Sequence, residues 1–426
     1  MLKICYKICC GIDVHKKMLI ATIATTNNEN ITTYETKRFS TMTNELNNLK
    51  KWLQEGNCKD VCMESTGKYW IPIFNILESS CKISIVHPKY VRAILGKKTD
   101  IKDSIWIADV FKHGLVQSSF IPTKEIRQLR ALLRYRTKLT YCKTSEKNRF
   151  QNSLITSNIM ISNVISDTFG KTSLSIIDLV LSKDKISEED IKPLICRNVK
   201  ATTEEILGSI DGIIDPSENI KIKLCLEHYN NIISVIDKLD TQILKLALTF
   251  EKEIKLICTV PGINLLSAVH ILAEIGNDMN QFKNSRFLCS WSGLVPQNNE
   301  SADKKKSVRI SHGGHYIKPI LIQCALATIR SKECDYFKHK YEILKKRRGH
   351  KKAIIAIARM LLTCIFNILT KSVPFDNSIY TQLDNKHFNN ADNVNIKTEA
   401  STNKIDEAVA VKLLLSLGYT LTASNK

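Results

Sequence analysis

Residues 8–23 have the sequence ICCGIDVHKKMLIATI and decide the fold of the first part of the chain. Two apolar runs lie on either side of the polar group HKK, a pattern typical of a β-hairpin with two buried strands. Further strands and helices alternate after this hairpin, which predicts an α/β domain with a mixed sheet. The other expected strands are 32–39, 61–65 and 82–88, and the expected helices are 44–54, 69–80 and 97–114.

Two long amphipathic helices are expected after this domain, over about 124–160 and 219–253. In both stretches apolar residues recur every three to four positions, with charged residues between them. Two such helices on either side of an insert predict an antiparallel coiled-coil arm. The insert, 161–218, is mostly helical by pattern, with Pro193 and Pro216 as helix breakers.

The last part of the chain changes in composition. Residues 258–371 are predicted to form a helical domain rich in Lys and Arg. After Pro374 the chain becomes rich in Asn, Asp and Thr, which predicts a flexible linker over 376–403. A short helix, KIDEAVAVKLLLSLG, is expected to follow at 404–418.

Composition indicates a globular protein with a polyanionic partner. The 426 residues include 62 Lys and Arg against 42 Asp and Glu, a formal net charge of +20. Nucleic acid is the expected partner, with an anionic membrane surface second. The 14 cysteines are scattered without zinc-site spacing, which favours thiols in a reducing cytoplasm. Charges interrupt the N-terminal apolar residues, so no signal peptide is expected, and the apolar stretch 353–369, with Arg359 near its centre, favours a buried helix over a membrane span.

Four carboxylates are the candidates for chemistry in the α/β domain. Asp13 lies on the first strand, Glu64 ends a second buried strand, and Asp100 and Asp103 share one face of a helix because they are three positions apart. Acids that converge repel one another unless a cation joins them, and Mg²⁺ prefers oxygen ligands of this kind. The alternative is that each is an ordinary helix-capping or surface acid. Spacing alone does not decide between the two.

These motifs resemble a known family. GIDVHKKMLIATI (11–23), MESTGKYW (63–70), and KKTDIKDSIWIADV (97–110) followed by a basic IRQLRALLRYR helix are similar to the DEDD transposases of IS110-type insertion sequences, a group that includes the Piv invertases. The resemblance covers about 1–155 and 257–372. It implies a RuvC-like, RNase H-type fold in which Asp13, Glu64, Asp100 and Asp103 hold Mg²⁺ or Mn²⁺. The insert and the tail after 376 resemble nothing in the family.

The second half of the chain carries the rest of the resemblance. VPGINLLSAVHILAEIG (260–276) predicts a helix-hairpin-helix whose Pro-Gly turn faces a phosphate, although a turn between two core helices has the same sequence pattern. In the segment that follows, Ser301 matches the catalytic serine of the family. Ala302 stands where the family has glycine, which leaves the geometry of this loop open. Ser290 and Ser292 are the alternative nucleophiles.

Two runs of basic residues accompany these motifs. Beside a phosphodiester site they are expected to bind backbone phosphates, contributing affinity rather than base specificity; the alternative is a solvated charged face. His15, His312 and His315 are possible proton shuttles, and we assign them no role. The candidate nucleic-acid-binding residues are Lys304, Lys305, Lys306 and Arg309 in the first run, and Lys345, Lys346, Arg347 and Arg348 in the second.

Together the residues and the resemblance predict four domains. The first is a RuvC-like α/β domain that carries the four acids, and the second is a helical coiled-coil arm with an insert. An all-α domain with the helix-hairpin-helix-like segment and a polar tail with a terminal helix complete the chain. The expected boundaries are 1–122, 123–256, 257–375 and 376–426.

The resemblance implies a transposase or recombinase of a bacterial insertion sequence. Ser301 would attack a scissile phosphate and form a phosphoserine–DNA intermediate, while the metal-bound acids stabilise charge. The expected partners are DNA, a structured noncoding guide RNA and further copies of the chain as a dimer or tetramer. The expected location is the bacterial cytoplasm, at the nucleoid and without a membrane. Two alternatives stay open: a RuvC-like junction-resolving nuclease that uses water as nucleophile, and a non-catalytic helix-hairpin-helix DNA-binding protein.

Overall fold

The computed structural model describes residues 2–87, 99–116, 118–183, 185–296, 300–301, 304–305 and 309–378. The chain divides into two compact units, Met1–Pro122 and Thr123–Lys426, which we call the α/β unit and the helical unit and describe separately. The helix expected at 404–418 and nearly all of the expected linker lie outside the described residues.

The α/β unit is built on one five-stranded mixed sheet, as the sequence predicts. Its strand order is β3-β2-β1-β4-β5. The neighbours β1–β2 and β2–β3 are antiparallel, so the N-terminal hairpin is confirmed, whereas β1–β4 and β4–β5 are parallel. The strands are β1 (Ile8–Val14), β2 (Met18–Thr26), β3 (Thr32–Ser40), β4 (Asp60–Glu64) and β5 (Lys82–Val86).

Helices cover both faces of this sheet. Strand side chains alternate between the two faces: Cys10, Ile12 and Val14 of β1 pack in the core formed with α1 (Thr43–Glu55) and α2 (Trp70–Leu77). Cys9 belongs to the core on the other face, formed with α3 (Asp100–Lys112). Asp13 shares the parity of Cys9, so it lies on the face that α3 covers.

The middle of α3 lies unusually close to β1, at Gly11. A Cβ atom on Gly11 would lie 2.3 Å from the backbone nitrogen of Ala108 and 2.4 Å from the carbonyl oxygen of Ser104, closer than real atoms come. The hydroxyl of Ser104 is hydrogen-bonded to that of Thr22 on β2 at 2.7 Å, and Thr22 is in turn bonded to Thr36 on β3 at 2.8 Å. These contacts fix the position of α3 along the strands.

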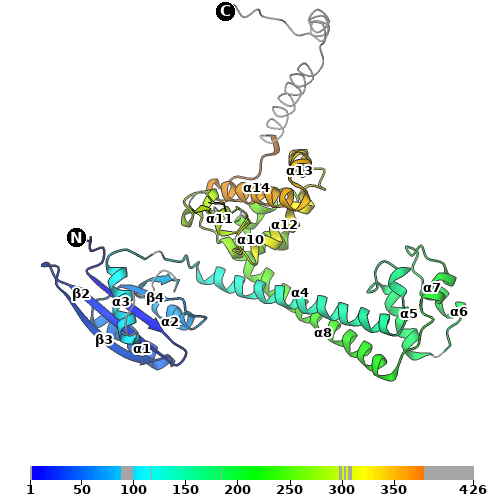
Figure 1. Cartoon of the computed structure of the whole chain (residues 1–426), viewed down its shortest axis with the longest axis horizontal. Helices are drawn as coiled ribbons and strands as arrows, with labels where there is room; N and C mark the ends of the chain where they lie inside the picture. The colour runs from blue at the N-terminus through cyan, green and yellow to red at the C-terminus, as the bar shows by residue number, and fades with distance from the viewer. Residues whose placement is uncertain are drawn as a thin grey trace, which may run out of the picture. The chain divides into compact units, whose positions relative to one another are not determined.

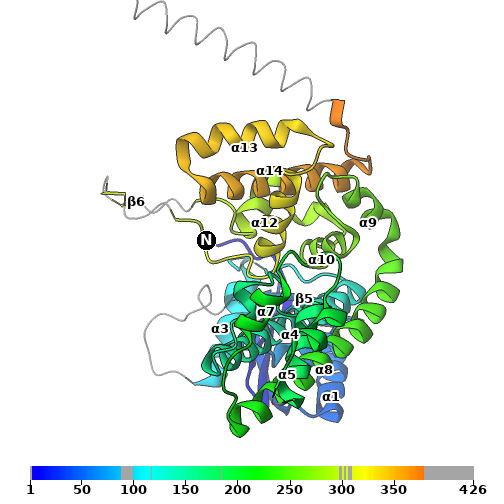
Figure 2. The same cartoon turned by 90° about the vertical axis from the view of Figure 1, so that its right-hand side faces the viewer.

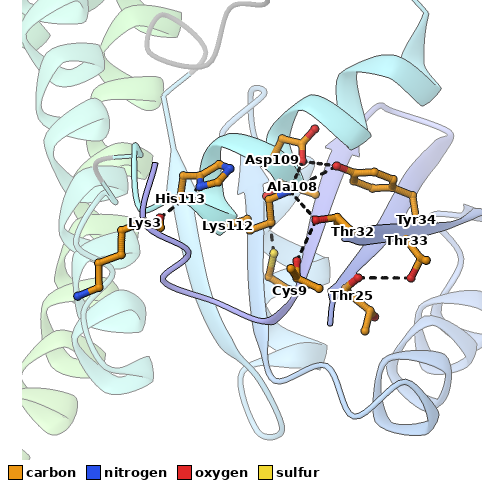
Figure 3. A network of polar contacts seen from close by, with 11 residues as sticks. Lys3, Cys9, Thr25, Thr32, Thr33, Tyr34, Ala108, Asp109, Lys112 and His113 are labelled. Atoms are coloured by element: carbon orange, nitrogen blue, oxygen red, sulfur yellow. Dashed lines mark hydrogen bonds and ion pairs between the residues drawn. The ribbon is translucent and has the colours of Figure 1, made fainter. Parts of the chain in front are cut away.

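A second group of polar contacts holds the far end of α3 (Figure 3). The buried ammonium of Lys112 donates to Asp109 at 2.9 Å, to Thr32 at 3.1 Å and to the hydroxyl of Tyr34 at 3.4 Å. Tyr34 also donates to Asp109 at 2.5 Å. Because Thr32 and Tyr34 belong to β3, this network ties the C-terminus of α3 to the edge of the sheet.

The helical unit begins with a pair of long antiparallel helices, α4 (Lys124–Thr156) and α8 (Pro216–Ala247), which lie side by side in Figure 1. Arg136 forms an ion pair with Asp240, and ten residues further along α4 Glu146 pairs with His228 at 3.0 Å. The partner positions on α8 decrease as those on α4 increase, which shows that the two helices run in opposite directions.

The segment between the two long helices forms a small apolar core at their far end (Figure 1). Its helices are short and joined by irregular segments, in an insert that the sequence predicts to be mostly helical. Pro216 is the first residue of α8, where its missing N–H and fixed φ suit a helix start. The helices of this segment are α5 (Lys171–Ser182), α6 (Glu188–Ile191) and α7 (Thr203–Ser209).

The remaining helices pack into one core together with the first turns of α4, which supply Ile126, Leu129 and Leu133. The chain turns out of its long helix earlier than the predicted residue 253: α8 ends at Ala247 and a short 3₁₀ turn separates it from α9. The helices of this body, seen from another side in Figure 2, are α9 (Glu251–Cys258), α10 (Leu265–Ile275), α11 (Ser285–Trp291), α12 (Ile317–Thr328), α13 (Asp335–Arg348) and α14 (His350–Lys371).

The apolar stretch at 353–369 forms most of α14, whose inner face lies in the core of this body. Ile357, Leu361 and Ile365 are fully buried there. In the part of the chain that the structure describes, α14 is the one helix with the length and hydropathy of a membrane span, and about half of that window, 56%, is buried in the protein. The core helix expected from the sequence is therefore present.

Candidate functional site

Asp13 and Glu64 lie next to each other because their strands are parallel neighbours. The register pairs Ile12 of β1 with Met63 of β4, so the following residue of each strand lies at the same edge of the sheet. Asp13 is only 6% exposed. Glu64 is half-buried, and its carboxylate accepts a hydrogen bond from the hydroxyl of Thr66 at 3.2 Å.

The start of α3 brings Asp100 and Asp103 to the same edge. Thr99 caps this helix by accepting a hydrogen bond from the backbone N–H of Lys102, and Asp100 is the first helical residue. Ala108 contacts Cys9 and Ser104 contacts Gly11, so α3 runs opposite to β1, and the helical turn before Ser104 lies beyond Gly11, where Asp13 lies. The helix position set by Gly11 thus brings the acids of α3 to the strand ends.

The pKa of Asp13 depends on its burial and on the charges of the residues around it, including the other three acids. Burial raises the pKa of Asp13; the imidazole of His15 lowers it, and the charges of Glu64, Asp103 and Asp100 raise it again. Each of the three other carboxylates is therefore near enough to disfavour the ionised form of Asp13. Of the four acids, Asp13 and Asp100 have carboxylate oxygens within 4.8 Å of each other, and Glu64 and Asp103 lie near enough for their charges to act on Asp13.

His15 lies between two of these acids, although nothing in the sequence pattern assigned it a role. Its Nε2 atom is 3.1 Å from Oδ2 of Asp13 and 3.5 Å from Oδ1 of Asp100. Its backbone N–H donates to the carbonyl of Met18 at 2.9 Å, within the turn between β1 and β2. The turn reverses the chain directly after Asp13, which places the ring of residue 15 beside the carboxylate of residue 13.

The donor atoms at this edge suit a divalent cation. One ligand atom each from Asp13, His15 and Asp100 lies within 4.8 Å of the other two. A buried carboxylate that three others repel is stabilised by a positive ion, and hard divalent ions accept carboxylate oxygens as ligands. The residues present therefore fit Mg²⁺ or Mn²⁺.

Ser301 belongs to a short two-stranded ribbon of the helical unit. Its strand β6 (Glu300–Ser301) pairs with β7 (Lys304–Lys305) so that Ser301 is opposite Lys304. Pro296 and Ile310 also pair, at the base of this excursion. The backbone of Ser301, Lys304 and Lys305 is described but their side chains are not, and Ala302 and Lys306 lie outside the described residues. The role of Ser301 stays a prediction.

The alternative serines differ in their surroundings. Ser292 is fully buried, and its hydroxyl donates to the carbonyl of Cys289 at 3.0 Å. Its backbone packs tightly: a Cβ on Gly314, whose φ is +68°, would lie 2.1 Å from the carbonyl oxygen of Ser292. Ser292 is thus a packing residue, as its apolar neighbourhood indicates, whereas Ser290 is exposed on α11.

The Pro-Gly turn between α9 and α10 packs against the end of α12. The hydroxyl of Thr328 donates to the carbonyl of Pro261 at 2.7 Å, and a Cβ on Gly262, whose φ is +79°, would lie 2.5 Å from the backbone nitrogen of Thr328. The glycine is required by this close approach and by its positive φ. Contact between the turn and a phosphate stays a prediction.

The predicted phosphate-binding residues at the end of α13 are exposed. Lys345 is paired with Glu342 at 3.7 Å, and Arg309, from the first run, is also exposed. The described histidines of this region, His312 and His315, are exposed too. The exposed basic residues at the C-terminal end of α13 are Lys345, Lys346, Arg347 and Arg348, and the exposed Lys351 and Lys352 follow in α14.

The arginines of the basic helix α4 are used inside the helical unit. Arg134 binds the buried carboxylate of Glu274 through two hydrogen bonds of 2.7 Å, and its guanidinium stacks over the ring of Tyr316. Arg130 donates to the carbonyls of Ala273 and Glu274 at the C-terminus of α10. These side chains fasten α4 to α10, a role that their sequence pattern did not reveal.

Cys9, Cys10, Cys58 and Cys62 of the α/β unit are buried thiols, whereas Cys5 is exposed. Burial raises the pKa of Cys9 to about 12 and that of Cys58 to about 12. Within the described ranges no disulfide joins any of the cysteines. A thiol with so high a pKa stays protonated at neutral pH and is a poor nucleophile or metal ligand.

Comparison with known proteins matches both halves of the chain. Residues 10–158 match a DEDD family model of IS110 type described as a transposase, and residues 254–342 match the transposase family IS116/IS110/IS902. The chain is 23% identical over 317 residues to the transposase for insertion sequence element IS1111A of Coxiella burnetii, covering 73% of this chain and 78% of that protein. It is 24% identical over 387 residues to the pilin gene-inverting protein of Moraxella lacunata, covering 87% of this chain and 98% of that protein.

Proposed function

The chain belongs to the IS116/IS110/IS902 family of transposases, and we propose that it cleaves and rejoins DNA at a divalent-cation site formed by Asp13, Glu64, Asp100 and Asp103. The observation that carries this proposal is geometric: Asp13 on β1 and Glu64 on the parallel neighbour β4 lie at one edge of the sheet, and a carboxylate oxygen of Asp100 on α3 lies within 4.8 Å of one of Asp13. Both curated relatives described above rearrange DNA by name, one by transposition and one by inversion of a gene.

Each acid has a separate part in this site. Asp13, at 6% exposure, provides the rigid ligand on the central strand, and Glu64 extends the ligand set to the neighbouring strand. Asp100 and Asp103 close the site from α3. The bound Mg²⁺ or Mn²⁺ supplies charge stabilisation at the scissile phosphate. The fold we propose for this unit is the RuvC-like, RNase H-type fold.

We propose Ser301 as the nucleophile. Its oxygen would form a bond to the phosphorus as the bond between phosphorus and the departing sugar oxygen breaks, leaving a phosphoserine–DNA intermediate and a free sugar hydroxyl. Two facts support this choice: Ser301 lies within the family-matching segment 254–342, and the buried Ser292 is engaged in packing. Ala302 stands where the resemblance leads us to expect glycine.

The remaining parts are proposed as the binding apparatus. The helices over 123–256 form a coiled-coil arm, 257–375 a helical domain whose Pro-Gly turn and basic residues hold backbone phosphates, and 376–426 a tail. DNA, a noncoding guide RNA and further copies of the chain, as a dimer or tetramer, are the proposed partners, in a cytoplasm and at its nucleoid. The net charge of +20 and the exposed basic end of α13 support nucleic-acid binding.

Cleavage assays with DNA carrying the element ends test this function. Asp13→Asn and Ser301→Ala should each abolish strand cleavage while DNA binding persists, and Ser301→Ala should also remove the covalent protein–DNA product seen on a denaturing gel. His113→Gln, at the far end of α3, is the control and should cleave normally.

The outcomes separate the proposal from its alternatives. Cleavage that persists in Ser301→Ala at near the wild-type rate, with no covalent product, would identify a nuclease that uses water. Binding without any metal-dependent cleavage by the wild-type protein would identify a DNA-binding protein. Normal cleavage by Asp13→Asn would overturn the metal site.

A further inference from the structure

We propose that the imidazole of His15 is itself a ligand of the divalent cation, so that the centre is a mixed nitrogen and oxygen site that favours Mn²⁺ over Mg²⁺. The inference deepens the proposed function and rests on its metal site. It assigns a role to a side chain outside the four acids.

The geometry around Nε2 of His15 is that of neighbouring ligands on one ion. In an octahedral site with ligands at about 2.1 Å, adjacent ligand atoms are separated by about 3 Å. Nε2 lies 3.1 Å from Oδ2 of Asp13 and 3.5 Å from Oδ1 of Asp100. One atom of the ring therefore stands at ligand spacing from two carboxylates that come from different elements, β1 and α3.

The surroundings of His15 allow the ring to serve as a ligand. The hydrogen bond from its backbone to Met18 fixes the Cα position in the turn, while the side chain is 41% exposed and free to adjust by the small shift that coordination requires. Asp13, by contrast, is held on a buried strand. The site thus combines a rigid carboxylate with an adjustable imidazole.

An ordinary ion pair is the competing explanation, since the 3.1 Å contact between Nε2 of His15 and Oδ2 of Asp13 is also a hydrogen-bond distance. A single histidine–carboxylate pair at a protein surface has one partner and contributes little stability. His15 instead directs one nitrogen at two acids that also repel each other, with the charges of Glu64 and Asp103 nearby. A ligand position explains why the same atom faces both.

The chemical consequence concerns metal choice. Mg²⁺ takes oxygen ligands and retains its waters, whereas first-row transition ions accept imidazole nitrogen as well as carboxylate oxygen. The neutral ring binds through the lone pair of Nε2 and keeps its proton on Nδ1. With His15 in place the site should bind Mn²⁺ more tightly than Mg²⁺, and without it this preference should shrink.

Pulsed electron paramagnetic resonance of the full-length protein with bound Mn²⁺ tests the inference without any activity assay. A directly coordinated imidazole gives a ¹⁴N modulation in the Mn²⁺ echo. We expect this modulation in the wild type and in the control His113→Gln, whose ring contacts the carbonyl of Lys3 away from the acids. We expect its loss in His15→Gln, with Mn²⁺ affinity lower by on the order of tenfold and Mg²⁺ affinity, from competition, changed less.

The possible failures of this experiment are distinguishable. If the wild type binds Mn²⁺ and Asp13→Asn does not, but no ¹⁴N modulation is seen, the metal site stands and the inference is overturned. A modulation that persists in His15→Gln belongs to another histidine and also overturns it. If the wild type binds no Mn²⁺, the metal site of the proposed function fails, and the ligand role fails with it.

Discussion

His270 is a buried titratable side chain in the body of the helical unit. It lies on α10 and is 9% exposed. Burial lowers its pKa to about 4, and the nearby Arg136 lowers it too, while Glu274 and Asp240 act in the opposite direction. The folded protein therefore keeps this ring neutral at pH values where an unfolded chain, with a pKa near 6.5, takes up a proton.

The helical unit should lose stability as the pH falls from about 6.5 to about 4. In this pH window His270 is protonated in the unfolded state and stays neutral in the folded state, so acid favours unfolding. A pKa shift of this size lowers the free energy of unfolding by about 3 kcal/mol. Chemical unfolding of the full chain at pH 7 and pH 4, with α10 followed by hydrogen exchange, measures it. His270→Gln should remove this part of the pH dependence; equal pH profiles for the two proteins would contradict the prediction.

Single residues differ in how far the sequence could place them. Asp13 and Glu64 were predictable partners because Asp13 lies near the end of one buried strand and Glu64 ends another, and parallel neighbours bring such ends together. The position of the His15 ring depends on the turn between β1 and β2. The spacing of residues along a strand does not predict where a side chain in such a turn points, so the contact between His15 and Asp13 was not predicted. Arg134 and Glu274 are 140 positions apart. The amphipathic pattern of α4 shows Arg134 only as one of several basic residues, so it does not predict the contact with Glu274.

The packing of α3 on β1 is the element-scale feature that positions the acids. Gly11→Ala would place a methyl group against backbone atoms of Ser104 and Ala108, which move only if the whole helix moves. We expect a loss of about 1–3 kcal/mol in the free energy of unfolding, together with weaker Mn²⁺ binding because Asp100 and Asp103 move with α3.

The control for this substitution is Gly208→Ala. Gly208 lies in α7, and no atom is within 4 Å of the position its Cβ would take, so alanine there should be neutral or slightly stabilising. Thermal unfolding and Mn²⁺ titration of both variants provide the comparison. Wild-type Mn²⁺ affinity in Gly11→Ala would show that the position of α3 does not set the metal site.

Helices and strands were predictable where the apolar residues follow one uniform pattern over a long stretch of sequence. The hairpin of β1 and β2 consists of two apolar runs on either side of a polar turn, and α4 and α14 have long helical periods, so each was expected close to its observed bounds. The end of α8 at Ala247 was not predicted, because the 3₁₀ turn and α9 that follow continue nearly the same apolar spacing as α8. The break there comes from packing in the core of the body, where Phe250 and Ile254 are buried.

At the scale of the whole molecule, the charge of +20 predicts nucleic-acid binding that weakens steeply with salt. If six to ten phosphates are neutralised, affinity should fall by about 10³–10⁵ between 50 and 200 mM salt. Replacing the exposed basic end of α13 with glutamine should reduce the slope by about one for each phosphate that the variant no longer neutralises. Filter binding at several salt concentrations measures the slope for the variant of Lys345, Lys346, Arg347 and Arg348.

A control variant separates direct phosphate binding from general charge. Lys183 and Lys192 are already paired with Asp190 and Glu188 at the far end of the long helices, and replacing them with glutamine should leave the slope nearly unchanged. Equal slopes for the wild type and the α13 variant would place the basic end of α13 on a solvated face that does not bind phosphate.

The antiparallel course of α4 and α8 makes the long helix pair modular. The chain leaves the helical body along α4 and comes back to it along α8, so the body meets the pair only at one end. Removing equal numbers of residues from both helices shortens the projection by about 1.5 Å per residue pair while the junction with the body keeps its geometry. Such a projection can lengthen or shorten in evolution, like a spacer of adjustable length, without altering the core of the helical body.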